Sequence, residues 1–157
     1  MDENIKRKIL FEMSQIDELL DSTKPLRDLC KTKVPDIIEK SAVALLLQSF
    51  YNGIENILII IVKYFDEKLP GSSKWHKELL EMAFEKTEGY GPIFRKEIKV
   101  ILNDYMSMRH FVRHTYGFRL DWEQMRELTN EIDSAWIMVK EDLNTFIENN
   151  SQAPNLA

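Results

Sequence analysis

Apolar residues recur at helical spacing along nearly the whole chain, which predicts an all-helical protein. The first such run has these residues at intervals of three to four: Ile5, Ile9, Leu10, Met13, Ile16, Leu19 and Leu20. Residues 22–25 (Ser-Thr-Lys-Pro) then predict a stop, because proline cannot donate the backbone hydrogen bond that continues a helix. A short second helical piece is expected to end near Pro35.

The next run predicts a long helix from Asp36 to about Phe65. Between Ile57 and Val62 it is apolar on all sides, so it should be central in the fold. Its apolar length raises the possibility of a membrane span. A span would, however, leave several polar side chains in lipid, namely Gln48, Asn52, Glu55 and Asn56. A helix buried in a protein core, with no membrane association, is therefore the preferred interpretation.

Two breaks divide the second half of the chain into three further helices. Residues 70–73 predict a turn, with Ser73 as the N-cap of a short helix that carries Trp75 and Leu79. After the breaker at 89–92, a helix is expected from about Phe94 to Tyr116, closed by Gly117.

The last helix is expected to start at 120–122 with Asp121 as its N-cap. No strand-like alternation competes with these helices. We therefore predict a single all-α domain over residues 1–148, an antiparallel bundle of about five helices, followed by a polar tail over 149–157.

Composition narrows the class of protein. The chain has 157 residues, 44% of them hydrophobic and 30% charged, which is typical of one globular domain. Its net charge of −5 argues against non-specific binding of nucleic acid over the whole surface. A lone cysteine, Cys30, excludes an internal disulfide and indicates a reducing, cytoplasmic location. Lys31 and Lys33 lie nearby, but a structural thiol is preferred to a reactive one.

One stretch departs from the acidic average. No acidic residue lies between Asp104 and Asp121, and the basic segment, residues 109–119, contains Arg109, His110, Arg113, His114 and Arg119. Such a cluster is suited to a phosphate backbone. The alternative is a solvated basic helix end that complements its own dipole.

Arg109 falls on the apolar stripe formed by Leu102, Tyr105 and Val112, where an unpaired charge would be costly to bury. It must meet a carboxylate inside the bundle, for which Glu55 is the candidate, or border a cleft or a second subunit.

His114 lies five positions beyond Arg109, so on a straight helix the two side chains point about 140° apart. Either the helix loosens near Gly117, or two copies related by a two-fold axis contribute to one site. His110 and His114 have the i, i+4 spacing of metal ligands. They lack a glutamate between them and a nearby third ligand, so we predict neither a metal nor a cofactor.

Arg109, His114 and Tyr116 form the pattern Arg-X4-His-X-Tyr, with the polar His110 directly after the arginine. This pattern resembles the signature of HEPN-domain ribonucleases of the HepT branch, and residues 51–58 also look like this family. The resemblance implies a helical homodimer that cleaves RNA without a metal. Arg109 and His114 would be the catalytic residues, and His110 and Arg113 would support RNA binding.

The resemblance also implies a partner and a form of control. HepT toxins pair with an MntA-like minimal nucleotidyltransferase antitoxin, which would neutralise the toxin by adenylylating Tyr116. Three alternatives stay open. In the first, the chain is a catalytically silent nucleotide- or RNA-binding subunit of a nucleotidyltransferase. In the second, it is a plain helical dimerisation module with a structural Arg109–Glu55 pair. The third concerns Tyr116 alone, which would be a core residue on the stripe of Leu102 and Tyr105.

Overall fold

The computed structural model describes residues 1–65 and 67–151, which contain only helices and connecting segments. The α-helices and the two short 3-10 helices follow in this order: α1 (Glu3–Thr32), α2 (Ile37–Tyr64), α3 (Trp75–Met82), η1 (Lys96–Ile98), α4 (Lys99–Arg113), η2 (Gly117–Arg119) and α5 (Trp122–Ser151). The prediction of an all-α bundle of about five helices is confirmed.

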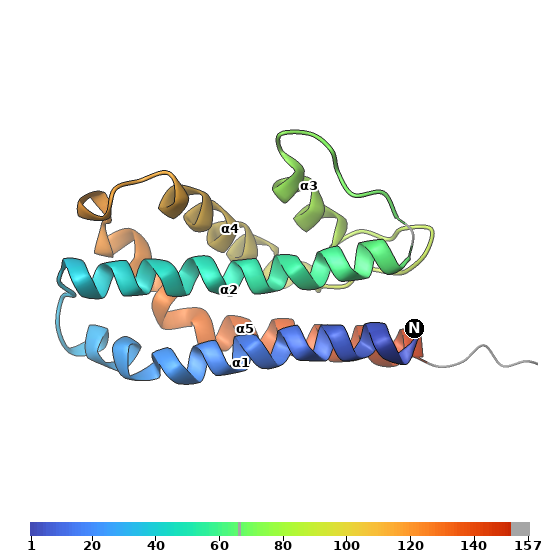
Figure 1. The fold of residues 1–157 in the computed structure, drawn as a ribbon, viewed down its shortest axis with the longest axis horizontal. Helices are drawn as coiled ribbons and strands as arrows, with labels where there is room; N and C mark the ends of the chain where they lie inside the picture. Colours follow the sequence, from blue (N-terminus) through green and yellow to red (C-terminus); the bar gives the residue numbers. More distant parts are fainter. Residues whose placement is uncertain (66, 152–157) are drawn as a thin grey trace, which may run out of the picture.

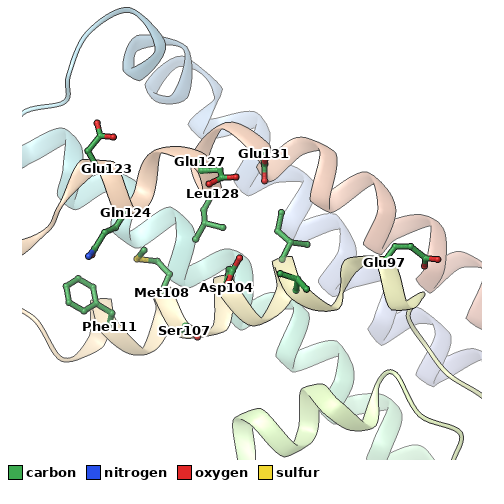
Figure 2. A pocket seen from close by; sticks show the side chains of 12 residues that line it. Glu97, Asp104, Ser107, Met108, Phe111, Glu123, Gln124, Glu127, Leu128 and Glu131 are labelled. Carbon is green, nitrogen blue, oxygen red and sulfur yellow. The ribbon is translucent and has the colours of Figure 1, made fainter.

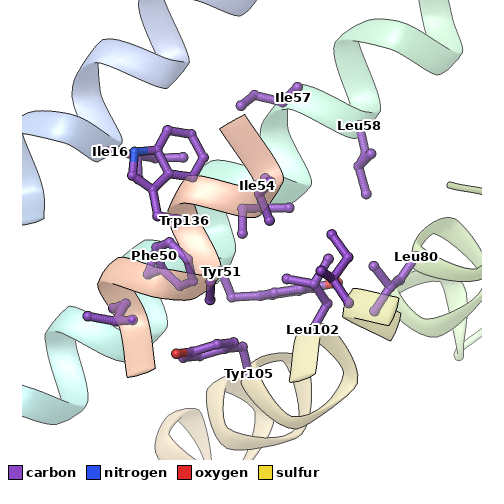
Figure 3. Close-up of a cluster of buried hydrophobic side chains, with 14 of the residues drawn as sticks. Ile16, Phe50, Tyr51, Ile54, Ile57, Leu58, Leu80, Leu102, Tyr105 and Trp136 are labelled. Carbon is purple, nitrogen blue, oxygen red and sulfur yellow. The ribbon is translucent and has the colours of Figure 1, made fainter. Parts of the chain in front are cut away.

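The helix α2 is the centre of the bundle, because it packs against α1, α3, α4 and α5. In Figure 1, α2 lies between α1 on one side and α3 and α4 on the other, and α5 crosses behind it. Successive long helices run in opposite directions (Figure 1). Phe50 of α2 contacts both Tyr105 of α4 and Trp136 of α5, with ring centroids 4.9 and 6.3 Å apart (Figure 3). Aromatic packing therefore joins three helices at one point.

The start of α2 is where the sequence predicts it, since Asp36 is its N-cap. The Asp36 side chain accepts a hydrogen bond from the Glu39 backbone N–H at 2.8 Å, and the Glu39 side chain accepts one from the Asp36 N–H at 3.0 Å. This reciprocal capping box satisfies two N–H groups that would otherwise lack partners. By length and composition, α2 alone among the described helices could cross a membrane, but 56% of its most apolar 18-residue window is buried inside the bundle. This burial is typical of a core helix.

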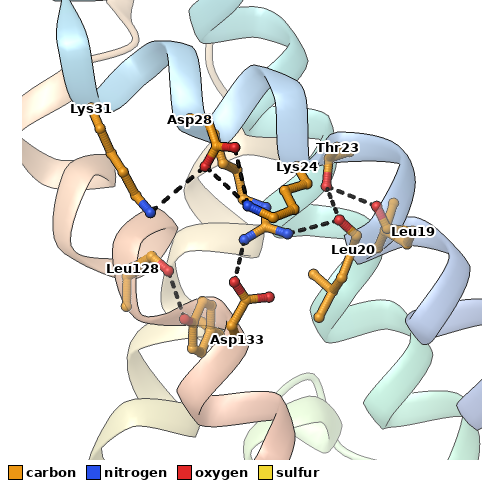
Figure 4. Close-up of polar contacts among 10 residues, drawn as sticks. Leu19, Leu20, Thr23, Lys24, Asp28, Lys31, Leu128 and Asp133 are labelled. Carbon is orange, nitrogen blue, oxygen red and sulfur yellow. Dashed lines mark hydrogen bonds and ion pairs between the residues drawn. The ribbon is translucent and has the colours of Figure 1, made fainter.

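The predicted stop at residues 22–25 is wrong, because α1 continues through Pro25 to Thr32. Side chains supply donors in the turn around the proline (Figure 4). The Thr23 hydroxyl donates to the Leu19 carbonyl at 2.7 Å, and Arg27 Nη2 donates to the Leu20 carbonyl at 2.7 Å. Arg27 also pairs with Asp133 of α5 at 2.7 Å. A buried arginine thus offsets the disruption that proline causes in a helix.

Two other predicted boundaries are wrong. Ser73 does not cap α3, which begins at Trp75 after Lys74 without a side-chain cap. The fourth helix begins at Lys99 rather than Phe94. Ile93 and Phe94 are buried, and both donate their backbone N–H to the Ala83 carbonyl, at 2.9 and 3.0 Å. Contacts with the end of α3 therefore hold this stretch out of the helix.

The helix α5 starts as predicted, since the Asp121 side chain accepts a hydrogen bond from the Glu123 backbone N–H at 3.0 Å. It extends to Ser151, so the first three residues of the predicted tail, 149–151, are helical. The remainder of that tail, 152–157, lies outside the described residues.

Candidate functional site

The basic segment spans the end of α4 and the turn that follows it. The helix ends at Arg113, three residues before the predicted end at Tyr116. His114 is the C-cap, and its backbone N–H donates to the Phe111 carbonyl at 3.1 Å. This bond spans three residues instead of four, so it tightens and closes the last turn. Arg109 is thus inside a helix and His114 at its end, and the straight-helix angle between them no longer applies.

Arg109 points into the bundle and is only 9% exposed. Its Nε donates a hydrogen bond to the Asn52 Oδ1 of α2. Its Nη2 lies 4.0 Å from Glu55 Oε1, at the limit of an ion pair. The predicted internal partner is therefore present, although Asn52 makes the closer contact. A buried cation with these partners avoids the cost of an unpaired charge.

Glu55 has a second partner that the sequence did not reveal. His76, at the start of α3, places its Nδ1 2.7 Å from Glu55 Oε2. Glu55 is 5% exposed and therefore needs partners on both of its carboxylate oxygens. Asn52 and Glu55 are three positions apart on α2, so their shared face was the signal for this polar cluster. His76 is far from both in sequence and offered none.

The hydroxyl of Tyr51 is a further buried polar group near Arg109 and Glu55. Among the described residues it is buried without a hydrogen-bond partner. Burial raises the pKa of Tyr51, the negative charge of Glu55 raises it further, and Arg109 lowers it. The phenol is therefore a neutral polar group beside the Arg109–Glu55 pair.

His110 and His114 lie together on the surface. Their ring centroids are 4.6 Å apart and their planes are inclined by 56°. Both side chains are exposed, as is Arg113 between them in sequence. Within residues 1–65 and 67–151, no group of three or more His, Cys, Asp or Glu side chains is arranged to hold a metal ion. Two neighbouring imidazoles can accept and donate protons in general acid–base chemistry.

Tyr116 is 71% exposed, so its interpretation as a core residue is wrong. It lies beyond the end of α4 in extended backbone, which removes it from the stripe of Leu102 and Tyr105. Its ring stacks on Phe118, itself 67% exposed, with centroids 5.6 Å apart. The Arg119 guanidinium lies 5.7 Å from the Phe118 ring centroid. Tyr116 thus lies on an open surface.

The predicted site residues therefore form two groups. His110, Arg113, His114 and Tyr116 are exposed at the end of α4, whereas Arg109 faces α2. No hydrogen bond or ion pair joins Arg109 to His114 in the described part of the chain. The exposed group offers two acid/base groups and a cation to solvent, and the buried group offers a cation already engaged by protein.

Cys30 plays no part in either group. It is buried, and this burial raises the pKa of its thiol, as does Glu39, while Lys33 lowers it. Burial outweighs the nearby lysine, which agrees with a structural thiol.

Residues 42–150 match the model of a protein family described as HepT-like protein. The match covers more than half of the chain and includes the basic segment and most of α2 and α5. The chain therefore belongs to the HepT-like family, and the predicted family is confirmed. Membership indicates a HEPN-type component of a toxin–antitoxin system. No curated protein and no solved structure matches the chain.

Proposed function

We propose that the protein is the cytoplasmic toxin of a toxin–antitoxin pair and an endoribonuclease that needs no metal. The observation that carries this proposal is the exposed pair His110 and His114 beside Arg113, in the stretch of the chain that lacks acidic residues. This stretch lies inside the region that matches the HepT-like family. An anionic RNA backbone would meet cations and acid/base groups at one place.

The proposed reaction is an intramolecular transesterification of the RNA backbone. The ribose 2′-hydroxyl attacks the adjacent phosphorus, its proton passes to one imidazole, and the bond between phosphorus and the 5′-oxygen breaks. A protonated imidazole donates a proton to that leaving oxygen, which yields a 2′,3′-cyclic phosphate and a 5′-hydroxyl. His114 fits this acid/base role because an imidazole can both accept and donate a proton. His110 and Arg113 would hold the neighbouring phosphates.

Arg109 would stabilise the charge that develops on phosphorus, since guanidinium grips phosphate through two donors. Its side chain is 11% exposed, so the guanidinium would first exchange Asn52 or Glu55 for the RNA. The 4.0 Å separation of Arg109 Nη2 from Glu55 Oε1 is too long for a hydrogen bond, so Nη2 can turn to a phosphate without breaking one.

The proposed site is completed by a second copy of the chain. Three exposed apolar side chains lie around the contact between α2 and η2, where Gly117 approaches Ser41: Ile38, Leu45 and Phe118. Ile38 and Leu45 are one turn before and after Ser41 on the same face of α2. A two-fold dimer through these side chains would bring two basic segments together.

The test is RNA cleavage in EDTA. Purified protein incubated with labelled RNA and EDTA is expected to release fragments that end in 2′,3′-cyclic phosphate. DNA of the same sequence should stay intact, because it lacks the 2′-hydroxyl nucleophile. Cleavage of both polymers, or cleavage that EDTA abolishes, would contradict the mechanism.

The engagement of Arg109 by Asn52 and Glu55 favours a second candidate, a silent subunit that binds nucleotide or RNA for a nucleotidyltransferase. In it, Arg109 would be structural and the exposed cations would hold phosphate. RNA binding without products at any protein concentration, in the same experiment, would support this candidate over the ribonuclease.

Tyr116 is the proposed site of neutralisation by an MntA-like nucleotidyltransferase. The Tyr116 hydroxyl oxygen would bond to the α-phosphorus of ATP, pyrophosphate would leave, and the phenol proton would pass to a base or to water. Its 71% exposure supports access by a second enzyme. The added phosphodiester would compete with RNA for the cations of the basic segment.

After incubation with the nucleotidyltransferase and ATP, intact-mass spectrometry is expected to show added AMP on the natural chain and none on Tyr116→Phe. Tyr64→Phe, which alters a half-buried tyrosine elsewhere, is the matched control and should still be modified. AMP that persists on Tyr116→Phe would assign the modification to another residue.

A further inference from the structure

A groove of about 570 Å³ runs between α4 and α5, on residues that the proposed reaction does not use (Figure 2). Its floor is apolar, formed by Leu128 of α5 and Met108 of α4. Two further apolar side chains of α4 line it and are unusually open, since Val100 is 74% exposed and Phe111 38% exposed. From Val100 to Phe111 the groove follows 11 residues of helix, or about 16 Å.

The edges of this groove are acidic. Five carboxylates line it: Glu97, Asp104, Glu123, Glu127 and Glu131. All five are exposed, and no lysine or arginine belongs to the lining among the described residues. Arg126 lies next to it and pairs with Glu123 at 3.2 Å, on the exposed surface. The other four carboxylates form no ion pair in the described part of the chain.

This arrangement costs the isolated protein stability. Glu123, Glu127 and Glu131 follow one another at intervals of four residues, so like charges lie one above another on the same face of α5. Each such pair destabilises a helix by a few tenths of a kcal/mol. Exposed Val100 and Phe111 add apolar surface in contact with water. A cationic and apolar ligand would relieve both unfavourable contacts at once.

We propose that this groove binds a basic amphipathic helix of a partner protein, with apolar side chains on Leu128 and Val100 and lysines or arginines facing the carboxylates. The groove length matches about three turns of such a helix, and helix-in-groove binding joins an apolar stripe to flanking charges. RNA is disfavoured because phosphates would meet five carboxylates. A second copy docked on the same groove by a two-fold axis would set acidic edge against acidic edge.

The probe is a fluorescein-labelled 14-residue helical peptide of lysine and leucine, and the measurement is its Kd by fluorescence anisotropy. Glu127→Lys/Glu131→Lys is expected to raise the Kd at least about tenfold, because each change removes an attraction and adds a repulsion. Glu85→Lys/Glu88→Lys is the matched control. Like the groove variant, it changes the net charge from −5 to −1, but its two residues are exposed outside the groove. It should therefore change the Kd of the peptide little.

Two further measurements complete the test. A peptide with the same lysines and serine in place of leucine should bind more weakly, since it lacks the apolar face. Val100→Ser should raise the Kd of the leucine peptide for the same reason. Equal weakening by the groove and control variants would overturn the proposal, because it would indicate general attraction of a basic peptide to an acidic protein.

Sedimentation tests whether the groove holds a second copy of the chain instead of a partner helix. If Glu127→Lys/Glu131→Lys converts a dimer of the natural protein to a monomer, the groove holds a second copy and the proposal is wrong. The proposal is independent of the ribonuclease function. The same variant should retain RNA cleavage, so loss of peptide binding and loss of activity are distinguishable.

Discussion

Replacement of His114 by alanine is expected to slow RNA cleavage by about 10²–10⁴-fold, the contribution of a positioned acid/base group. The fold should not change, because His114 is exposed at the C-cap of α4 and its ring packs only against His110 among the contacts described. The measurement is the rate of appearance of cyclic-phosphate ends, together with the far-ultraviolet circular dichroism and the melting temperature.

Lys77→Ala, which removes an exposed charge from α3, is the control and should cleave at the natural rate. A His114→Ala protein that also cleaves at the natural rate would remove His114 from the mechanism. His110→Ala tells where the second imidazole comes from. A loss as large as that of His114→Ala would indicate that one chain supplies both, and a smaller loss would indicate His114 from each of two protomers.

Arg109→Met is expected to lower the free energy of unfolding by about 3 kcal/mol, the usual cost of breaking a buried ion pair. Methionine approximates the volume of the side chain but leaves the buried Glu55 with His76 in place of two partners, and Asn52 Oδ1 without its donor. The decrease is measured by urea unfolding. An unchanged free energy of unfolding would show that the Arg109–Glu55 contact contributes nothing to stability.

The double variant Arg109→Met/Glu55→Met separates structure from catalysis. Replacement of both partners by apolar side chains should recover most of the lost stability. His76 then loses its carboxylate, but its side chain is 28% exposed and can bind water. If this stable variant has lost RNA cleavage, Arg109 acts on the RNA. If it cleaves at the natural rate, Arg109 is a structural residue and the catalytic role assigned to it is wrong.

The sequence predicted the helix starts that depend on hydrogen bonds between residues close in sequence. Asp36 with Glu39, and Asp121, cap α2 and α5 through hydrogen bonds to residues two or three positions away, so the sequence alone was sufficient. The continuation of α1 through Pro25 was not predictable in this way. It depends on Arg27, which is held in place by Asp133, more than one hundred residues away.

The sequence identified the basic segment and Glu55 as a carboxylate near Arg109, but not the contact of Arg109 with Asn52. It could not show that α4 ends at Arg113, which determines that Tyr116 is exposed. Nor could it reveal His76, because a histidine at the start of a short helix gives no sign of the buried carboxylate that it meets through the fold.

The contact of α2 with every other α-helix has a consequence for the dynamics of the chain. A helix at the centre of all the packing cannot open while its neighbours stay in place, so its amide hydrogens should exchange with solvent only when the whole domain unfolds. Asn52 and Glu55 belong to this most protected helix, whereas His110 and His114 lie at an exposed helix end. His110 and His114 are therefore free to move, while the residues that hold Arg109 stay as rigid as the core itself.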